Sequence, residues 1–465
     1  MADASPNNLA LKPLILVLCH PLTGHVSPVL RLAALLHEQG WSVSFLSSAF
    51  FRPRIEAAGL RFLPLLGAAA LDDTSLFPKS PLRTAGGAER PLVPSVIDSH
   101  HQTLDSVPAQ WASVKSALAQ LHREAPGRRV VVICEAFFYG SLPLKLGAPL
   151  PDGVPAPPTL CVSITAPAIR SVDLPPFCWP LPFDPSADGR RRNAAAWEEW
   201  ETRVLPLTRA LDARLLEAGS VRGVGEVFMG GGNYTLHDAI LQIGLPGFEY
   251  PRSDPPGHFK LVGILPPTTA GERADLGWWV EIVANASLNE RDPNRKKVVV
   301  VAQGTVETEP TELILPTMRH LEGQAHVLTV AILGSRGARL SPTVKVPHNA
   351  RIADYLNYDA ILRHADLWVH NGGYGATTHG ISHGVPMVIA GEGQDKPESG
   401  KRVAYSGLGI NLGCARPSIE RLGEAINRVL EESCFVRAAR QLSSVAARTN
   451  CVGLVQEEIF RLTAA

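Results

Sequence analysis

The chain has 465 residues, of which 45% are hydrophobic and 19% charged, so it is long enough for two globular domains and too apolar for a disordered chain. Lys plus Arg equals Asp plus Glu at 44 each, a balance that gives no electrostatic signature of nucleic acid or an anionic membrane as a partner. No apolar stretch has the length of a membrane span, and seven scattered cysteines without zinc spacing favour a reducing compartment, so we expect a cytoplasmic protein with no integral membrane segment.

Patterns of buried strands and amphipathic helices alternate along the first half of the chain. Expected strands lie at 14–19, 41–48, 61–65, 130–135 and 159–165, and expected helices at 24–40 and 52–59. Strands that alternate with helices indicate a parallel sheet with helices on both faces. The segments 68–105 and 166–200 are rich in Pro, Gly and Ser, and we expect them to be long loops over a site.

A second series of strands begins near residue 296. Its expected strands lie at 296–305, 325–334, 367–370 and 385–390. The fold class that we predict is α/β, with two doubly wound Rossmann-like domains that face a cleft. The predicted divisions are an N-terminal domain at 1–265, a linker at 266–295, a C-terminal domain at 296–440 and a C-terminal helix at 441–465.

Two residues near the ends of predicted strands are candidates for acid–base chemistry. His25 lies at the start of the first helix, where the positive end of the helix dipole favours a neutral imidazole that can act as a base. Glu135 ends the buried strand 130–135, where a carboxylate is costly unless it is paired. Glu135 could orient His25 and stabilise its protonated form. The alternatives are a surface histidine at a helix start and an ordinary polar residue at a strand exit.

The stretch DLWVHNGGYGATTHG, residues 366–380, has the order strand, Gly-Gly turn, helix. Glycines let an anion approach the backbone, and the start of the helix supplies N–H donors. We therefore predict an anion site, with a plain strand-to-helix turn as the alternative. Its candidate residues are His370, Asn371, Gly372, Gly373 and Gly375.

Asp395 and Lys396 follow the next strand, in GEGQDKPESG. A sugar needs such paired acceptors and donors, because its hydroxyl groups are both. A solvated charged loop is the more frequent fate of a run of this kind.

These motifs together resemble a known family. The run 353–412, which contains ADYLNYDAIL, HNGGYGATTH and GQDKPESG, resembles the nucleotide-binding region of family 1 glycosyltransferases, the UDP-glycosyltransferases of the GT-B fold. Within that family it is similar to the macrolide-glycosyltransferase-like branch of bacteria and fungi. Weaker similarity in PLTGHVSP, in 248–265 and in VVVVAQGT extends the resemblance over nearly the whole chain. The resemblance implies that the first domain binds the acceptor and the second a nucleotide sugar.

The resemblance also implies roles for the positions around the nucleotide. Tyr355 takes the place of the aromatic residue that stacks on uracil, and Tyr358 falls where many relatives have a glutamine near the base. Asn371 takes the place of the phosphate-binding histidine, although a shift of one residue would put His370 there. His379 stands where a glutamate usually holds the ribose hydroxyls.

Further matches concern the diphosphate and the sugar. Gly304 and Thr305 match the glycine and the small hydroxyl residue that touch the diphosphate. Asp395 matches the acid that holds the hydroxyls of the donor sugar, and Lys396 replaces the glutamine that usually follows it.

The implied reaction is an inverting transfer of a hexose, with glucose as the expected sugar, from a UDP-sugar to a hydrophobic aromatic or polyketide small molecule. His25 matches the catalytic base of the family, and Glu135 stands where the family has an aspartate. Four aromatic residues of the first domain would line an apolar acceptor pocket, unless they are ordinary core residues: Phe137, Phe138, Phe177 and Trp179.

The UDP-sugar is expected as a co-substrate, with no further cofactor. We expect no metal either, because the N-terminus of the helix at 371–376 can stabilise the departing diphosphate. The expected partners are therefore the nucleotide sugar and the small-molecule acceptor, and the sequence leaves the oligomeric state open. The alternative functions are a catalytically silent nucleotide-sugar-binding protein and a nucleotide-sugar epimerase on the same fold.

Overall fold

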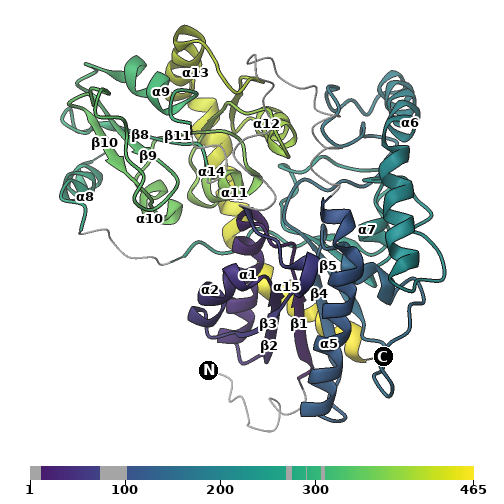
Figure 1. Ribbon diagram of the computed structural model, residues 1–465. Coiled ribbons are helices and arrows are strands. Elements are labelled where there is room, and N and C mark those ends of the chain that lie inside the picture. The colour runs from purple at the N-terminus through teal and green to yellow at the C-terminus, as the bar shows by residue number, and fades with distance from the viewer. Residues whose placement is uncertain (1–11, 74–101, 269–274, 290, 305–308, 465) are drawn as a thin grey trace. The chain divides into compact units, whose positions relative to one another are not determined.

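The computed structural model describes residues 12–73, 102–268, 275–289, 291–304 and 309–464. It divides into two compact units (Figure 1). Unit 1 consists of Met1–Ile243, Pro251–Leu265 and Asn450–Ala465. Unit 2 consists of Gly244–Tyr250 and Pro266–Thr449.

Unit 1 is built on a parallel sheet that has seven strands in the described residues, in the order β3-β2-β1-β4-β5-β6-β7. The strands are β1 (Leu14–Leu18), β2 (Val43–Ser47), β3 (Arg61–Pro64), β4 (Val130–Glu135), β5 (Thr159–Ser163), β6 (Ala239–Gln242) and β7 (Phe259–Leu261). The α-helices are α1 (Thr23–Glu38), α2 (Arg52–Ala57), α5 (Val107–Glu124), α6 (Ala187–Glu217), α7 (Gly232–Thr235) and α15 (Cys451–Ala464). Short 3₁₀ helices are η2 (Ala49–Phe51), η3 (Gly67–Ala69) and η4 (Tyr139–Leu144).

The strand order of unit 1 reverses between β1 and β4. These strands pair in parallel from Leu14↔Val130 to Leu18↔Cys134, so their carboxyl ends lie side by side. In open α/β sheets, ligands bind at the carboxyl ends of the strands where the order reverses. The pairing therefore places the loop after β1 next to Glu135, the last residue of β4.

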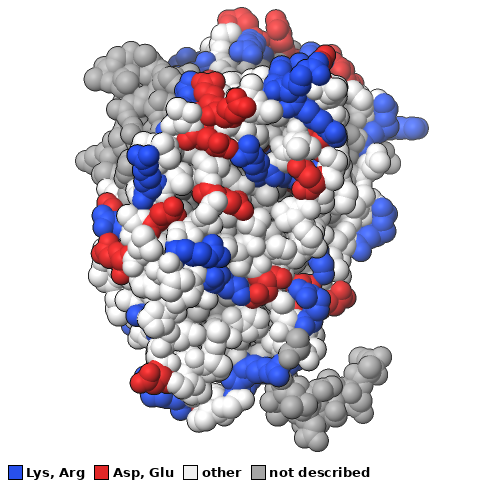
Figure 2. Space-filling model, turned by 90° about the vertical axis from the view of Figure 1, so that its right-hand side faces the viewer, with Lys and Arg blue, Asp and Glu red and all other residues white. Residues whose placement is uncertain are grey.

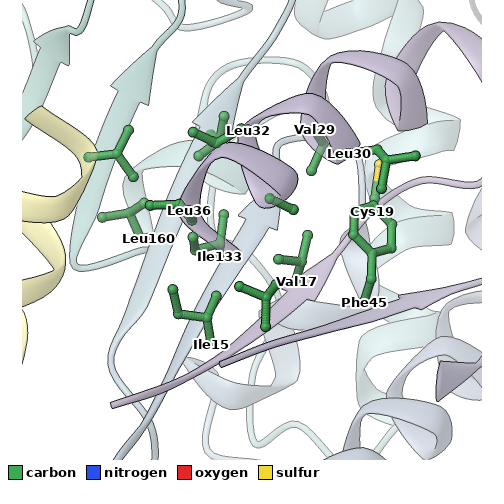
Figure 3. Packing of buried hydrophobic residues seen from close by; sticks show 14 of the residues in the cluster. Ile15, Val17, Cys19, Val29, Leu30, Leu32, Leu36, Phe45, Ile133 and Leu160 are labelled. Carbon is green, nitrogen blue, oxygen red and sulfur yellow. The ribbon is translucent and has the colours of Figure 1, made fainter. Parts of the chain in front are cut away.

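The core of unit 1 follows from the alternation of side chains along its strands. Ile15 and Val17 of β1 pack with α1 on one face of the sheet (Figure 3). The intervening Leu16 belongs to a second cluster, which contains the buried face of α5. Side chains in a strand alternate between faces, so one apolar strand supplies both clusters. Figure 3 labels the other packed residues Cys19, Val29, Leu30, Leu32, Leu36, Phe45, Ile133 and Leu160.

Unit 2 contains a second parallel sheet, with six strands in the described residues, in the order β10-β9-β8-β11-β12-β13. The strands are β8 (Lys297–Ala302), β9 (Val327–Ile332), β10 (Ala350–Ala353), β11 (Leu367–His370), β12 (Met387–Ile389) and β13 (Gly409–Asn411). The helices are α8 (Trp279–Ser287), α9 (Ile314–Leu321), α10 (Tyr358–Leu362), α11 (Tyr374–His383), α12 (Lys396–Tyr405), α13 (Ile419–Glu431) and α14 (Ser433–Arg448).

The order of this sheet reverses between β8 and β11. These strands pair from Leu367↔Val299 to His370↔Ala302, which brings the residues after Ala302 beside those after His370. The predicted α/β fold class, with two Rossmann-like parallel sheets, is confirmed by both sheet orders.

The predicted domain boundaries differ from the observed units in three places. The predicted linker 266–295 contains α8, whose Trp279 and Ile282 are buried within unit 2, so it is part of that unit. The segment Gly244–Tyr250 also belongs to unit 2, not to the first domain. The predicted helix 441–465 is instead divided between two helices, α14 and α15, because residues 449–450 are not helical. The second helix returns to the core of unit 1 through Val455 and its neighbours.

The predicted loop 166–200 is also partly wrong, because α6 begins at Ala187. Ser186 caps this helix by accepting the N–H of Gly189, and Trp197 and Trp200 are buried in the unit 1 core. The many polar residues of the segment lie on the exposed side of a long amphipathic helix. Of the other predicted loop, 68–105, residues 74–101 lie outside the described part of the chain.

The surface of α6 carries charged side chains of both signs, and several of them form ion pairs. Arg203 pairs with Glu199, and Arg214 lies 2.9 Å from Asp105. Figure 2 shows Lys and Arg interspersed with Asp and Glu on the face that it displays. No helix in the described part of the chain combines the length and hydrophobicity that a membrane span requires.

Ile133 provides a test of the packing that holds β1 and β4 together. Its side chain is 1% exposed and pairs between Val17 and Leu160. We expect Ile133→Ala to lower the free energy of unfolding by about 2–5 kcal/mol, because it leaves a cavity in a packed core. Urea denaturation measures this change. The control Val280→Ala, at a side chain that is 71% exposed, should change stability by less than about 0.5 kcal/mol. Equal effects of both changes would contradict the described packing.

Candidate active site

The predicted pair of His25 and Glu135 is brought together at the reversal of the first sheet. His25 is the third residue of α1, and its Nδ1 lies 3.2 Å from Oε1 of Glu135. The Glu135 side chain is fully buried, whereas the His25 side chain is 20% exposed. The same Oε1 accepts the backbone N–H of Phe137 at 3.1 Å. A carboxylate at this distance favours the neutral tautomer of His25 that carries its proton on Nδ1.

Two neighbouring rings confine the imidazole of His25. The ring centroid of His20 lies at 5.3 Å and that of Phe137 at 5.6 Å, both in edge-to-face geometry. Thr23, the first residue of α1, donates its backbone N–H to Asp73 at 2.9 Å. Sequence reasoning missed His20 and Asp73. His20 stands in the same motif as His25, CHPLTGH, and could have been found there. Asp73 is 50 positions from its partner Thr23 and has no local signal.

In unit 2, the reversal of the sheet joins Gly304 and Asn371. Gly304 follows β8 with φ +81°, a conformation that favours glycine. The side-chain Nδ2 of Asn371 donates to the backbone oxygen of Gln303. These two predicted residues therefore lie together at the carboxyl ends of β8 and β11. Thr305 lies outside the described residues.

His370 is the last residue of β11 and Asn371 is the first residue after it, and the two side chains occupy different environments. The His370 ring is 1% exposed and stacks on Trp368, with centroids 5.0 Å apart. Its Nδ1 accepts the N–H of Gly372 at 3.1 Å, and burial lowers its pKa to about 3. His370 is therefore neutral at physiological pH and turned into the packing of unit 2, whereas Asn371 reaches the backbone beside Gly304.

The glycines after Asn371 leave backbone accessible at the start of α11. Gly372 has φ +89°, and a Cβ there would come within 2.7 Å of the Ile389 side chain. At Gly373 and Gly375, by contrast, a Cβ would meet no atom within 4 Å. The start of α11 thus combines a tight turn with open space beside the helix N-terminus, which suits an anion.

The Asp395-Lys396 pair stands at the start of α12, with Asp395 as the N-cap residue. Its Oδ2 accepts the backbone N–H of Tyr374 at 3.4 Å, so the two helix starts touch. Lys396 is 4% exposed, and its Nζ donates to the side-chain oxygen of Gln394 at 3.0 Å. The lysine therefore braces its own turn, in which Gln394 adopts φ +57°.

Tyr355 and Tyr358 differ in exposure. The Tyr355 ring is 37% exposed, and the guanidinium of Arg336 lies 4.9 Å from its centroid. Asp354 accepts the N–H groups of both Gly337 and Tyr355 at 2.7 Å and so holds the two loops together. Tyr358 packs edge-on against Trp368 at 5.0 Å, and burial raises its pKa.

His379 is oriented by a buried carboxylate that sequence reasoning missed. Oδ1 of Asp359 lies 2.7 Å from Nδ1 of His379 and 2.9 Å from Nε2 of His383. Thr268 donates both its N–H and its hydroxyl to the other oxygen of Asp359. Burial raises the pKa of Asp359, but the two histidines outweigh this effect and hold it far below its usual value. The His379 side chain is 39% exposed, so Nε2 is the atom that remains for a ligand.

The predicted acceptor-contacting aromatics fall into two groups. Phe137 lies beside His25, and Trp179 belongs to the same core cluster, against which Phe177 packs. Phe138 is 1% exposed and lies in the other cluster with Trp111, so it is a core residue and its predicted contact with the acceptor is wrong.

A cavity of about 590 Å³ opens in unit 1 between α6 and the segment 225–230, and none of these aromatics lines it. In the part of the chain that the structure describes, no group of three or more His, Cys, Asp or Glu side chains is arranged to hold a metal ion.

Comparisons with known proteins place these sites in context. Residues 325–460 match the family described as erythromycin biosynthesis protein CIII-like, C-terminal domain. The chain is 32% identical to UDP-glucosyltransferase A1 of Starmerella bombicola, over 96% of this chain and 92% of the relative. It is also 32% identical to UDP-glucosyltransferase 1 of Beauveria bassiana, over 97% of this chain and 95% of the relative.

The crystal structures that resemble this chain share its fold at low sequence identity. The glycotransferase of kitacinnamycin superimposes with a TM-score of 0.67 at 17% identity, over 97% of this chain and 99% of that one. The calicheamicin glycosyltransferase CalG4 gives a TM-score of 0.65 at 16% identity, over 97% of this chain and 98% of that one. Both are GT-B glycosyltransferases, so the predicted GT-B fold is confirmed.

The buried, neutral His370 predicts how stability depends on pH. Its pKa is about 3 in the folded chain and near 6.5 in the unfolded chain, so only the unfolded state takes up this proton between those values. The free energy of unfolding should therefore fall as pH drops below 6.5, by roughly 1–2 kcal/mol at pH 5 from this group.

His370→Asn tests this dependence, because asparagine keeps an acceptor for Gly372 and does not titrate. Urea unfolding at pH 7 and pH 5 should show a smaller loss for the variant than for the wild type. His122→Asn, on the helix α5, is the control and should keep the wild-type loss. A loss in His370→Asn as large as that of the wild type would show that His370 is not a buried neutral group.

Proposed function

Because this chain belongs to the family of UDP-glycosyltransferases with the GT-B fold, we propose that it transfers glucose from UDP-glucose to a hydrophobic small molecule, with inversion at the anomeric carbon. Two fungal relatives are named as UDP-glucosyltransferases, which supports UDP-glucose as the donor. The similar structures carry the names of kitacinnamycin and calicheamicin, which supports a natural product of aromatic or polyketide type as the acceptor.

The single observation that carries the mechanism is the contact of His25 with Glu135 at the carboxyl ends of β1 and β4. In the proposed step, Nε2 of His25 removes the proton of an acceptor hydroxyl as that oxygen attacks the anomeric carbon. The bond from this carbon to the diphosphate oxygen breaks, and UDP departs with the electron pair. Glu135 balances the charge of the resulting imidazolium through Nδ1.

The donor is proposed to lie along the carboxyl edge of the unit 2 sheet. The exposed face of Tyr355 would stack on uracil, and Nε2 of His379, oriented by Asp359, would meet the ribose hydroxyls. The open backbone at Gly373 and Gly375 would receive the diphosphate. We assign the phosphate contact to Asn371, because His370 is turned into the packing of unit 2.

The remaining donor roles follow from the residues nearby. Gly304 and Thr305 are proposed to border the diphosphate, and Asp395 to hold the sugar hydroxyls. Lys396 braces the turn before α12 and would support Asp395 from the same loop. Tyr358 would act through packing under the base, because its ring lies against Trp368 and His379.

An apolar acceptor suits the surroundings of the proposed base. The edge-on ring of Phe137 is 5.6 Å from that of His25, and Phe177 and Trp179 extend the same aromatic cluster. Such a surface favours a flat, apolar molecule with one reactive hydroxyl over a charged one.

We also propose that the reaction needs neither a cofactor nor a metal ion. The N–H groups at the start of α11 and the positive end of its dipole can stabilise the departing diphosphate, the task that a metal would otherwise perform. All seven cysteines are free, which suits the reducing conditions of the cytoplasm, the compartment that we propose.

The direct experiment incubates the purified protein with UDP-glucose and a panel of phenolic and polyketide acceptors. We expect release of UDP, together with an acceptor that has gained one hexosyl unit in β-linkage, and no loss of turnover in EDTA. Turnover that stops in EDTA and returns with Mg²⁺ would contradict the metal-free mechanism. Binding of UDP-glucose without turnover of any acceptor would favour a silent binding protein. Conversion of the sugar without UDP release would favour an epimerase.

The role of His25 is tested by His25→Ala. Loss of the base should lower kcat by about 10²–10⁴-fold, whereas the Kd of UDP-glucose should stay within about twofold, because the donor residues belong to unit 2. Steady-state kinetics and calorimetric titration measure the two quantities. The matched control His122→Ala should leave both unchanged. A His25→Ala variant that retains most of the wild-type kcat would overturn the assignment of the base.

A further inference from the structure

A buried ionic cluster lies beneath the proposed donor site of unit 2. It consists of Glu249, Tyr374, Glu398 and Arg402, and we call it the Glu249 cluster. The Arg402 guanidinium, 2% exposed, donates from Nε to Oε2 of Glu249 at 2.8 Å and from Nη1 to Oε2 of Glu398 at 2.7 Å. The hydroxyl of Tyr374 donates to Oε1 of Glu249 at 2.7 Å. Each oxygen of the Glu249 carboxylate therefore holds a different helix.

Arg402 and Glu398 keep their charges at neutral pH. Burial opposes the charge of Arg402, but Glu249 and Glu398 outweigh it and hold the arginine pKa above its usual value. Burial raises the pKa of Glu398, but Lys401 and Arg402 outweigh it and lower the value to about 2. The ring of Tyr250 covers the Arg402 guanidinium at 4.5 Å.

Stability alone is a weak reason for such a cluster. Replacing a buried ion pair by well-packed apolar residues is often neutral or stabilising, since the desolvation of two charges offsets their attraction. What an ion pair adds is direction, because its hydrogen bonds fix the positions of the groups that they join. The question is therefore which positions the Glu249 cluster fixes.

The cluster links the start of α11 to both ends of α12. Tyr374 is the first residue of α11, next to the open backbone of Gly373 and Gly375. Its side chain contacts Glu249, while its backbone N–H points to Asp395, the N-cap residue of α12. Along α12 the chain then reaches Arg402, which returns to Glu249. One carboxylate, which is 5% exposed, thus joins the start of α11 to the last turn of α12, and the helix α12 carries this constraint back to its own start at Asp395.

We propose that Glu249 is a positioning residue of the donor site, which sets the spacing between the diphosphate-binding start of α11 and the sugar-binding start of α12. This inference rests on the proposed function. Glu249 touches neither the nucleotide nor the sugar in this assignment and acts through Tyr374 and Arg402. UDP needs only the α11 side, whereas UDP-glucose needs both sides at once. Loss of Glu249 should therefore weaken the binding of UDP-glucose more than the binding of UDP.

The test compares the Kd values of UDP and UDP-glucose by isothermal titration calorimetry of the full chain. For Glu249→Gln we expect the Kd of UDP-glucose to rise about tenfold or more, and that of UDP by less than about threefold. Steady-state kinetics should show a higher KM for UDP-glucose with a smaller change in kcat. Tyr374→Phe, which removes one hydroxyl and leaves the Arg402 pair intact, should shift the ratio of the two Kd values in the same direction and decides the matter if Glu249→Gln does not fold.

Glu458→Gln is the matched control. Its carboxylate is 2% exposed and accepts hydrogen bonds from Lys260 at 2.6 Å and Arg461 at 2.7 Å within unit 1. It should lower thermal stability without changing the ratio of the two Kd values. The inference is overturned if Glu249→Gln and Tyr374→Phe weaken the binding of UDP and of UDP-glucose equally, or if they change only thermal stability. In either case Glu249 has a structural role alone. If the wild type binds no UDP-glucose at all, the proposed function itself fails, and the inference with it.

Discussion

Each sheet reverses its strand order once, and the central groups of both candidate sites lie at that reversal. The crossovers on either side of the reversal run to opposite faces of the sheet, so the carboxyl ends of the two central strands are left uncovered. In unit 1 these ends present His25 and Glu135. In unit 2 they present Gly304 and Asn371. One topological constraint, used twice, thus positions the proposed base in one unit and the proposed anion site in the other.

A second theme is the use of buried carboxylates to orient groups at or next to the proposed sites. Glu135 is 0% exposed and meets His25, Asp359 is 0% exposed and meets His379, and Glu249 is 5% exposed and meets Tyr374. A buried carboxylate is costly unless it is paired, so each of these contacts is strongly favoured over alternatives. The group that it holds therefore has one preferred orientation, which is what the proposed transfer between two substrates requires.

The sequence predicted the candidate sites unevenly, for physical reasons. Local signals were sufficient for the Gly-Gly turn after β11, because glycine and a helix start form a pattern within a few residues. The pair His25–Glu135 was predicted from a helix start and a strand end, together with the family resemblance, since parallel strands present their carboxyl ends on one edge. Phe138 was predicted to contact the acceptor because the sequence does not distinguish an aromatic residue of a core from one that lines a pocket. Its burial in the structure decided between the two.

Other features depended on contacts between residues far apart in the chain. Glu249 meets Arg402 across 153 positions, and Asp359 meets Thr268 across 91. No periodicity or spacing encodes such pairs. The first part of the helix α6, residues 187–200, was predicted to be a loop because its polar face dominates the local composition. Only the burial of Trp197 and Trp200 reveals its packed side.

The sequence by itself determined most of the central strands of both sheets, the first two helices and the glycine-rich turn at 372–375, because hydrophobic period and turn chemistry are local properties of a chain. It also determined the family, through an ordered run of motifs. It missed the short strands β6, β7, β10 and β13. Only the tertiary structure decided that His370 is packed inward while Asn371 borders Gly304, that Gly244–Tyr250 belongs with the second sheet, and that one carboxylate joins the start of α11 to the last turn of α12. Those outcomes depend on which faces are buried and which distant charges meet, and such quantities exist only once the chain has folded.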